Sequence, residues 1–285
     1  MKKSNAKEKI CGLASYAVLT VLTVAACWFF AGRYGVFGAN MDWISQHSVF
    51  PEYFRQQFYK TGQFFPEYAA NIGGGQNIYN FSYYGLYNPI VLIAYLLPFV
   101  KMSDYLMAAS VICLAVSVCL LYGWLKKRRF STEIALGVAV LFLLAGPMIY
   151  QSCHQIMFVQ YMPFLLMTFL GVDRYWEKGK PGLYTLGVFL MILTSFYFSI
   201  AGMAAIFLYG WYGYPKGIRK RKLFGFPVPM IVAVLSAGVL LVPTAYAILQ
   251  RSGSSQSQNL KELLMPNLQL DSSLYGTYSV GLTVI

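Results

Sequence analysis

The segment Ile10–Gly32, ICGLASYAVLTVLTVAACWFFAG, decides the fold of this chain. It contains no charged residue, and it is long enough to cross a hydrocarbon core about 30 Å thick, which takes about 20 helical residues. The apolar run of a cleavable signal peptide is shorter, about 7 to 15 residues. We therefore interpret this segment as a retained membrane span. The basic residues in front of it are Lys2, Lys3, Lys7 and Lys9.

The composition of the whole chain agrees with a membrane protein. Of the 285 residues, 58% are hydrophobic and 11% are charged, and the mean hydropathy is +0.54. A soluble domain has about 25% charged residues. The net charge of +12 does not indicate a nucleic-acid partner, because the Lys and Arg residues form short clusters between apolar runs, as orientation signals do.

The cysteines indicate neither disulfides nor a metal site. Their number is odd, most lie inside apolar runs, and no two have the spacing of metal ligands. We interpret them as small core residues. They are Cys11, Cys27, Cys113, Cys119 and Cys153.

Seven apolar segments are predicted to cross the membrane, which gives an all-α, polytopic helical protein. The fifth and sixth form one apolar stretch broken around 195–202, for which we expect a tight hairpin, with one long tilted helix as the alternative. The predicted spans are 10–32, 103–125, 132–150, 157–172, 183–198, 199–214 and 226–249.

The distribution of basic residues predicts the orientation. Sixteen of the 22 Lys and Arg residues fall in the segments 1–9, 126–129, 173–181 and 215–222, which all lie inside if the N-terminus is cytoplasmic. Making 88–100 a full crossing would place 126–129 outside. This short segment is therefore predicted to be re-entrant or to lie at the interface.

The large first outer loop, residues 33–102, contains a predicted amphipathic helix near 48–60. Apolar and aromatic residues recur there at helical spacing, with charged residues on the other side. Ser48 is the expected N-cap, and Pro51 is tolerated in a first turn. The helix either lies on the membrane surface or plugs the top of the bundle.

Asp42 follows the first span directly, and two roles remain open for it. Asp is a preferred helix N-cap residue. At the membrane boundary a carboxylate can also act as a general base or as a ligand for a divalent cation. The spacing of the neighbouring residues does not decide between these roles.

Further along the loop, three consecutive glycines, Gly73 to Gly75, precede a run rich in Tyr and Asn. Consecutive glycines allow the backbone to pass close to a ligand, and their amides could bind a phosphate, although they do not match a nucleotide-binding fingerprint. An ordinary flexible turn is the alternative. Tyr faces and Asn amides are suited to sugar rings and hydroxyls. The run includes Tyr83, Tyr84 and Asn88.

The second outer turn contains His154 and Gln155. Neither His154 nor the other histidine of the chain has a second ligand at metal spacing, so we predict no zinc site. His154 then either lines a cavity with a hydrogen-bonding group or binds phosphate or the acceptor.

Taken together, these residues resemble the N-terminal part of the bacterial YfhO family of membrane proteins, which belongs to the GT-C superfamily of glycosyltransferases that use lipid-linked sugars. The resemblance covers nearly the whole chain, and it depends on the order and spacing of loose motifs. These motifs are Asp42 with Ser45 and Gln46; Phe64, Phe65 and Pro66 leading to Ile72–Gly75; Ser82, Tyr83 and Tyr84 with Asn88 and Pro89; 155–163 with Gly171 and Arg174; and 194–197 with Gly202.

The resemblance implies an enzyme of the bacterial plasma membrane that moves a sugar from a polyprenyl-phosphate carrier to an envelope polymer, such as a teichoic acid, on the outer face. Asp42 matches the acidic residue that is usually the catalytic base or metal ligand of such enzymes. The resemblance therefore leaves open whether the enzyme uses a divalent cation as a cofactor. A basic group would stabilise the leaving phosphate. The candidates in the outer loop are Arg33, Arg55 and Lys60, and the sequence does not favour one of them. The substrate-binding residues we assign are Gln46, Arg55, Lys60, Tyr83, Tyr84, Asn88, His154 and Gln155.

Family members of this type are several hundred residues longer. We expect residues 1–250 to form the membrane module and 251–285 to open a further outer segment, so that the chain is a fragment or an early-terminated form. The alternative functions are a transporter or flippase and a non-catalytic scaffold for envelope assembly. A transporter would carry ionisable residues at mid-membrane, whereas the span interiors here are nearly free of charge.

Overall fold

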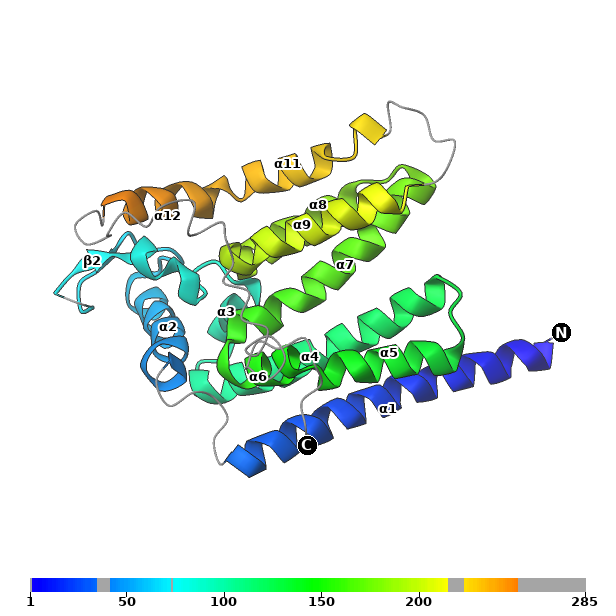
Figure 1. Ribbon diagram of the computed structural model, residues 1–285. Coiled ribbons are helices and arrows are strands. Elements are labelled where there is room, and N and C mark those ends of the chain that lie inside the picture. The colour runs from blue at the N-terminus through cyan, green and yellow to red at the C-terminus, as the bar shows by residue number, and fades with distance from the viewer. Residues whose placement is uncertain (1, 35–41, 73, 215–222, 251–285) are drawn as a thin grey trace, which may run out of the picture.

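The computed structural model of the protein describes residues 2–34, 42–72, 74–214 and 223–250. In this part the chain is almost entirely helical, with one two-stranded hairpin, which confirms the predicted all-α class. The helices run back and forth between two ends, and residues 42–72 and 74–101 form a separate unit at one of these ends (Figure 1).

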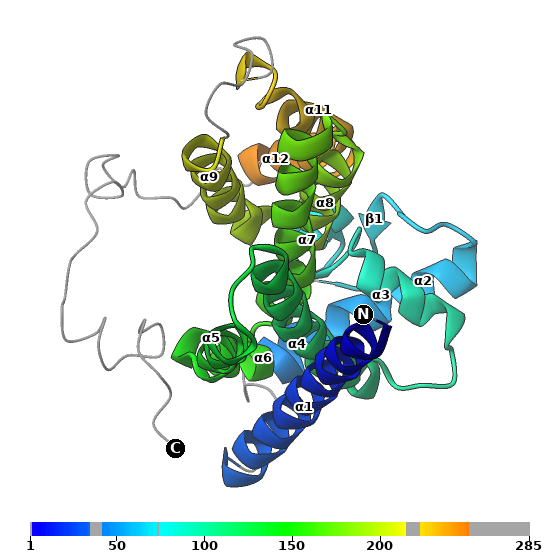
Figure 2. The ribbon, with the colours of Figure 1, turned by 90° about the vertical axis from the view of Figure 1, so that its right-hand side faces the viewer.

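The helices of the bundle follow the order of the predicted spans. Figure 2, which looks along them, shows α1, α4 and α5 on one side and α8, α9 and α11 on the other, with α7 between. Their bounds are α1 Lys2–Tyr34, α4 Met102–Lys127, α5 Thr132–Leu144, α6 Gly146–His154, α7 Ile156–Lys178, α8 Gly182–Thr194, α9 Phe196–Tyr212, α11 Val228–Ser236 and α12 Gly238–Gln250.

The structure does not confirm seven spans. In the described residues, three helices are long and apolar enough to cross a membrane, namely Gly12–Gly32, Met102–Lys127 and Ile156–Lys178, and the bent pair α11–α12 makes a fourth if it counts as one span. The apolar helices α5, α8 and α9 have 13, 13 and 17 residues. At about 1.5 Å per residue they are shorter than a core about 30 Å thick.

Three breaks explain these short helices. The predicted span 132–150 is interrupted at Ala145, which has extended backbone torsions and is followed by Pro147 in the first turn of α6. A kink of 63° separates α11 from α12. The third break, at Ser195, is the predicted hairpin: a Cβ at Gly202 would lie 2.9 Å from the sulfur of Met191, so α9 folds back against α8.

The main core surrounds α7, which packs closely on α8. A Cβ at Gly171 would lie 2.6 Å from the backbone nitrogen of Tyr184, so the two helices can approach this closely only because position 171 has no side chain. Trp176 and Tyr184 stack on Phe226, at ring centroid distances of 5.0 and 5.4 Å. Aromatic contacts therefore join α7, α8 and the segment before α11.

Charged groups are concentrated at the end of the bundle opposite the separate unit. Asp173 of α7 is buried and lies 2.7 Å from the guanidinium of Arg128, which also sits over the rings of Trp124 and Tyr209. Lys127 lies 3.1 Å from Glu177. The predicted cytoplasmic segments 126–129 and 173–181 thus meet at one end, and the predicted segment 215–222 lies outside the described residues, as does 251–285.

Residues 42–101, which we call the loop unit, have a hydrophobic core of their own. This core contains Phe54, Ile78, Leu86 and Tyr95, and it continues into the adjoining ends of α4, α7 and α12. The elements of the loop unit are the π-helical turn η1 Trp43–His47, α2 Val49–Thr61, β1 Tyr68–Ala69, β2 Gln76–Asn77, the 3₁₀ helix η2 Ile78–Tyr84, α3 Pro89–Ile93 and the 3₁₀ turn η3 Ala94–Leu96.

The helix predicted near 48–60 is present in the loop unit as α2, and Pro51 lies in its first turn. Its faces differ from the prediction, because the charged residue Arg55 is buried and Val49 is exposed. The predicted cap is wrong, because the hydroxyl of Ser48 donates to the carbonyl of Trp43, 2.8 Å away, and makes no cap hydrogen bond. Gly74 and Gly75 form the turn of the β1–β2 hairpin, and both have positive φ angles.

The segment 88–100 does not form a spanning helix. It contains α3, with five residues, and η3, with three. The side chains of Ile93, Leu96 and Phe99 are exposed, while Ala94 and Tyr95 are buried against α2 and its neighbours. This agrees with the prediction of a short element that does not cross the membrane.

Candidate functional site

Six side chains from three separated segments gather where the loop unit meets the bundle. They come from η1 and the residue before it, from the end of η2, and from the junction of α6 and α7. Five of them were predicted as site residues, and His47 was not. We call this group the polar cluster: Asp42, Gln46, His47, Tyr83, Tyr84 and Gln155.

Tyr84 links the η1 turn to η2. Its hydroxyl donates a hydrogen bond to the side-chain carbonyl of Gln46. Its ring stacks on Phe50, with centroids 4.6 Å apart, and contacts the His47 ring edge-on at 5.6 Å. Aromatic packing therefore fixes the orientation of this phenol.

Tyr83 connects the same region to the helical bundle. Its hydroxyl lies 3.4 Å from Oε1 of Gln155, at the start of α7. Its ring meets Tyr84 edge-on at 5.4 Å and also contacts Phe196 and Tyr197 of α9 edge-on. The two adjacent tyrosines thus contact different parts of the chain.

Asp42 lies at the N-cap position of η1, but its side chain makes no cap hydrogen bond. It is partly buried. The capping role that the sequence left open is therefore not realised in the described structure. The carboxylate is close enough to His47 to favour the charged form of that imidazole.

His47 is the residue of the cluster that our reading of the sequence missed. Its side chain is 2% exposed, and its Nδ1 has no hydrogen-bond partner among the described residues. Burial lowers the pKa of this imidazole from 6.5 to about 4, and the nearby Asp42 opposes that shift. Nothing in the sequence pattern marks this histidine. Only the folded chain shows it in a π-helical turn, a structure that is frequent at functional sites.

Asn88 is buried and bonded on both sides. Its Oδ1 accepts from the backbone nitrogen of Ile90, at 2.9 Å, and its Nδ2 donates to Oε1 of Gln160, at 2.6 Å. The first bond caps α3, and the second ties this cap to α7. These contacts place Asn88 outside the polar cluster.

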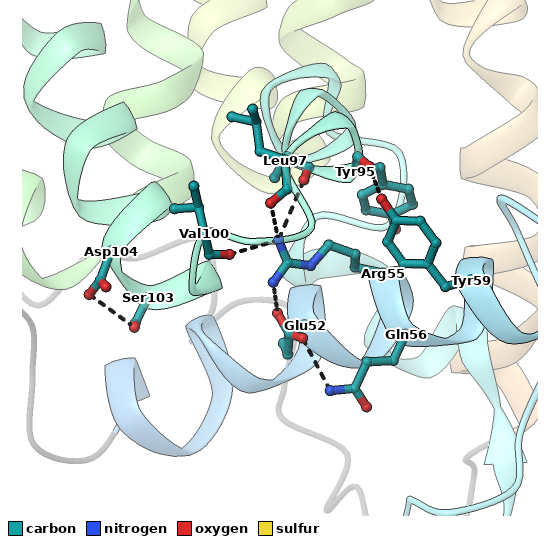
Figure 3. A network of polar contacts seen from close by, with 10 residues as sticks. Glu52, Arg55, Gln56, Tyr59, Tyr95, Leu97, Val100, Ser103 and Asp104 are labelled. Atoms are coloured by element: carbon teal, nitrogen blue, oxygen red, sulfur yellow. Dashed lines mark hydrogen bonds and ion pairs between the residues drawn. The ribbon is translucent and has the colours of Figure 1, made fainter.

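Arg55 is 4% exposed, and its guanidinium joins α2 to the segment before α4 (Figure 3). One terminal nitrogen donates to the carbonyls of Ala94, Leu97 and Val100, at 3.5, 3.0 and 2.9 Å. The other terminal nitrogen lies 2.5 Å from the carboxylate of Glu52. These bonds occupy the groups that would otherwise bind a phosphate.

Lys60 and His154 also lie apart from the polar cluster. Lys60 is exposed near the C-terminal end of α2, about 15 Å along the helix from Phe50, which contacts the cluster. His154 stacks on Tyr150, with centroids 4.1 Å apart, and its Nδ1 lies 2.8 Å from the Tyr150 carbonyl. The side chain of Arg33 lies outside the described part.

The described residues contain no group of three or more His, Cys, Asp or Glu side chains that could hold a metal ion. Asp42 and His47 are the polar cluster's carboxylate and imidazole. The chemistry of the described cluster is therefore that of one carboxylate, one imidazole, two phenols and two amides.

We expect replacement of Arg55 to loosen the segment between α3 and α4. The change Arg55→Lys keeps the charge but cannot supply three carbonyls and Glu52 together, because an ammonium is a point donor. The lost bonds should destabilise the loop unit by roughly 2 kcal/mol. Faster hydrogen exchange over residues 94–104, measured by mass spectrometry, would report this change.

Lys60→Ala is the matched control, since Lys60 is exposed on the same helix and makes no hydrogen bond or ion pair within the described residues. It should leave exchange over 94–104 unchanged. Equal exchange in the Arg55→Lys protein and the wild type would contradict the structural role of Arg55.

We expect the stability of the loop unit to fall as the pH falls from about 6.5 to about 4, the interval between the unfolded and folded pKa values of His47. In this interval the unfolded chain takes up a proton that the folded protein excludes, so the free energy of unfolding decreases, in total by on the order of 3 kcal/mol. Thermal unfolding of His47→Gln and wild-type protein over this interval measures the effect. His154→Gln should keep the pH dependence because it leaves His47 in place, and a pH dependence that survives in His47→Gln would refute this assignment.

Comparison with known proteins identifies the family. No curated protein and no solved structure matches the chain significantly. The family described as bacterial membrane protein YfhO matches residues 16–281, which include every member of the polar cluster and all of the described helices except the start of α1. The chain therefore belongs to the YfhO family of bacterial membrane proteins.

Proposed function

We propose that this protein is a membrane glycosyltransferase that moves a sugar from a polyprenyl-phosphate carrier to a cell-envelope acceptor on the outer face of the plasma membrane. Membership of the YfhO family is consistent with the GT-C superfamily and supports this proposal. The acceptor class we favour is an envelope polymer of the teichoic-acid type or a glycolipid. The polar cluster is the proposed site of reaction.

The state of Asp42 is the observation that carries the proposal. Of the seven acidic residues whose side chains the structure describes, Glu52, Asp173 and Glu177 pair with cations. Asp42 instead lies close enough to His47 to act on its imidazole, and it makes neither an ion pair nor a cap bond within the described residues. Its oxygens are therefore available to accept a proton.

In the proposed reaction Asp42 takes the proton of an acceptor hydroxyl. The resulting oxygen attacks the anomeric carbon of the donor sugar, and the bond from that carbon to the phosphate oxygen breaks. The lipid phosphate leaves with the bonding electron pair. A carboxylate at the boundary between bilayer and water suits this step, since the donor headgroup would lie at the same depth.

The remaining residues of the polar cluster have the groups that a sugar site requires. Tyr83 and Tyr84 offer aromatic faces and phenolic hydroxyls, and Gln46 and Gln155 offer amides for sugar hydroxyls. His47, which burial keeps neutral, is proposed to position the Asp42 carboxylate. The cation for the departing phosphate is not assigned, because Arg55 is bonded elsewhere and Lys60 is remote along α2.

We expect Asp42→Asn to abolish sugar transfer while the protein reaches its normal level in the membrane. Loss of a general base costs about 10² to 10⁴-fold in rate. The measurement is the sugar content of envelope polymers in a deletion strain complemented with the full-length gene carrying either residue. Protein abundance is followed in parallel.

Glu67→Gln is the matched control, because Glu67 is an exposed carboxylate of the loop unit outside the polar cluster. It should restore envelope glycosylation to the wild-type level. If Asp42→Asn restores it equally well, Asp42 is not the base, and a non-catalytic scaffold becomes the better explanation.

The proposal also requires the loop unit to face the exterior. In a cysteine-free background, a membrane-impermeant maleimide should label Glu67→Cys in intact cells and Lys180→Cys only after permeabilisation. Both positions are exposed, so accessibility of the side chain does not limit the reaction. The reverse pattern would place the polar cluster in the cytoplasm and remove the basis for a lipid-linked donor on the outer face.

A further inference from the structure

A cavity of about 640 Å³ lies between α1 and α4, with Leu170 of α7 contributing to its wall. The two helices that form it are candidate membrane spans. Tyr16, Thr20 and Val24 line it from α1 at intervals of four residues, so they share one face of that helix. We call this cavity the α1–α4 groove.

Small side chains on α4 create the groove. Ala115, Cys119 and Gly123 face it, again at intervals of four residues, and the row ends at Lys127. A Cβ at Gly123 would lie 2.8 Å from the hydroxyl of Tyr16, so the missing side chain leaves room for that phenol. The helices run in opposite directions here, because Tyr16 contacts Tyr122 and Thr20 contacts Cys119.

The groove opens toward the bilayer along most of its length. Val24, Ile112 and Val116 line it, and their side chains are exposed. From Ile112 to Lys127 the groove follows α4 for about 23 Å at a rise of about 1.5 Å per residue. This length exceeds half of a hydrocarbon core about 30 Å thick, so one leaflet's acyl chain fits along it.

The polar end of the groove is basic. Lys127 is partly exposed there, and it lies at the end of the bundle where cations outnumber carboxylates in the described residues. The charged residues of this end are Lys126, Lys127, Arg128, Arg129, Arg174, Lys178 and Lys180, against Glu133, Asp173 and Glu177. A lipid with net negative charge is favoured there over a zwitterionic lipid, which would also bring an ammonium group.

We propose that the α1–α4 groove binds one anionic phospholipid, with an acyl chain along α1 and α4 and the headgroup phosphate at Lys127. The hydroxyl of Tyr16, about one helical turn below Lys127, faces the same end of the groove. This site is separate from the polar cluster and does not depend on the glycosyltransferase proposal.

The test is competitive retention of lipid by the purified full chain, measured by native mass spectrometry after incubation with phosphatidylglycerol and phosphatidylcholine of identical acyl chains. The wild type should retain phosphatidylglycerol preferentially. Lys127→Gln should reduce this preference about fivefold, the effect of one lysine near an anionic headgroup. Ala115→Leu, which fills the groove, should reduce retention of both lipids.

Two control variants separate the cation from its ion pair and from general surface charge. Glu177→Gln removes the nearer of the two carboxylates that pair with Lys127, Asp173 being the other, but keeps the cation, and it should retain phosphatidylglycerol at least as well as the wild type. Lys180→Gln removes an exposed cation of the same end that does not line the groove, and it should leave the preference unchanged.

Equal retention of the two lipids by the wild type would overturn the proposal, as would an equal effect of Lys127→Gln and Lys180→Gln. Undiminished retention by a folded Ala115→Leu protein would also overturn it. Should Ala115→Leu fail to fold, the wild-type competition and the comparison of the two lysine variants decide the question.

Discussion

The loop unit depends on satisfying backbone carbonyls where the chain is not helical but lies next to a membrane span. Three such carbonyls, those of Ala94, Leu97 and Val100, point at the Arg55 guanidinium (Figure 3). Without it, these carbonyls, which follow the short helices α3 and η3, would lose their side-chain donor. Glu52 forms an ion pair with Arg55, so the two side chains together carry no net charge.

The same requirement explains how the loop unit is attached to the bundle. Each attachment joins one polar group of the loop unit to one from a helix far away in sequence: Asn88 to Gln160 and Ser82 to Thr244, at 2.6 and 2.9 Å. Buried polar groups left unpaired would cost more than these bonds contribute, so the contacts specify one docked arrangement. The polar cluster, which spans the same junction, therefore has its geometry set by rigid neighbours.

The sequence predicted the features that depend on local pattern. The apolar runs gave the positions of α1, α4, α7, α8 and α9, the periodicity of 48–60 gave α2, and the hairpin at Ser195 followed from the length of its apolar stretch. The breaks at Ala145 and Ala237 were not predicted, because apolar composition continues through both. The hydropathy of a segment indicates that it is apolar, but it does not indicate the backbone torsions at which a helix ends.

Roles that depend on long-range contacts could not be read from the sequence. Arg55 was assigned to phosphate, yet besides Glu52 its guanidinium bonds carbonyls that lie 39 to 45 residues further along the chain. For Asp42 the sequence left open whether it is a helix cap or a functional carboxylate. The absence of a cap hydrogen bond is seen only in the folded turn. His47 was overlooked because nothing in its local pattern shows that its imidazole is buried beside the single carboxylate of the polar cluster.

The acidic residues at the two ends of the bundle differ in whether they form ion pairs. At one end the buried carboxylate of Asp173 is paired with Arg128 and Lys127, and the Arg128 guanidinium sits over the rings of Trp124 and Tyr209, so these contacts stabilise helix packing. At the other end Arg55 and Glu52 form the corresponding pair, but Asp42 stands apart from it among neutral groups. A structural carboxylate at a membrane boundary is stabilised by pairing, because desolvating an unpaired charge is costly. Among the described residues, Asp42 makes no ion pair and lies close to the buried imidazole of His47, so the pairing that stabilises Glu52 and Asp173 does not account for its position.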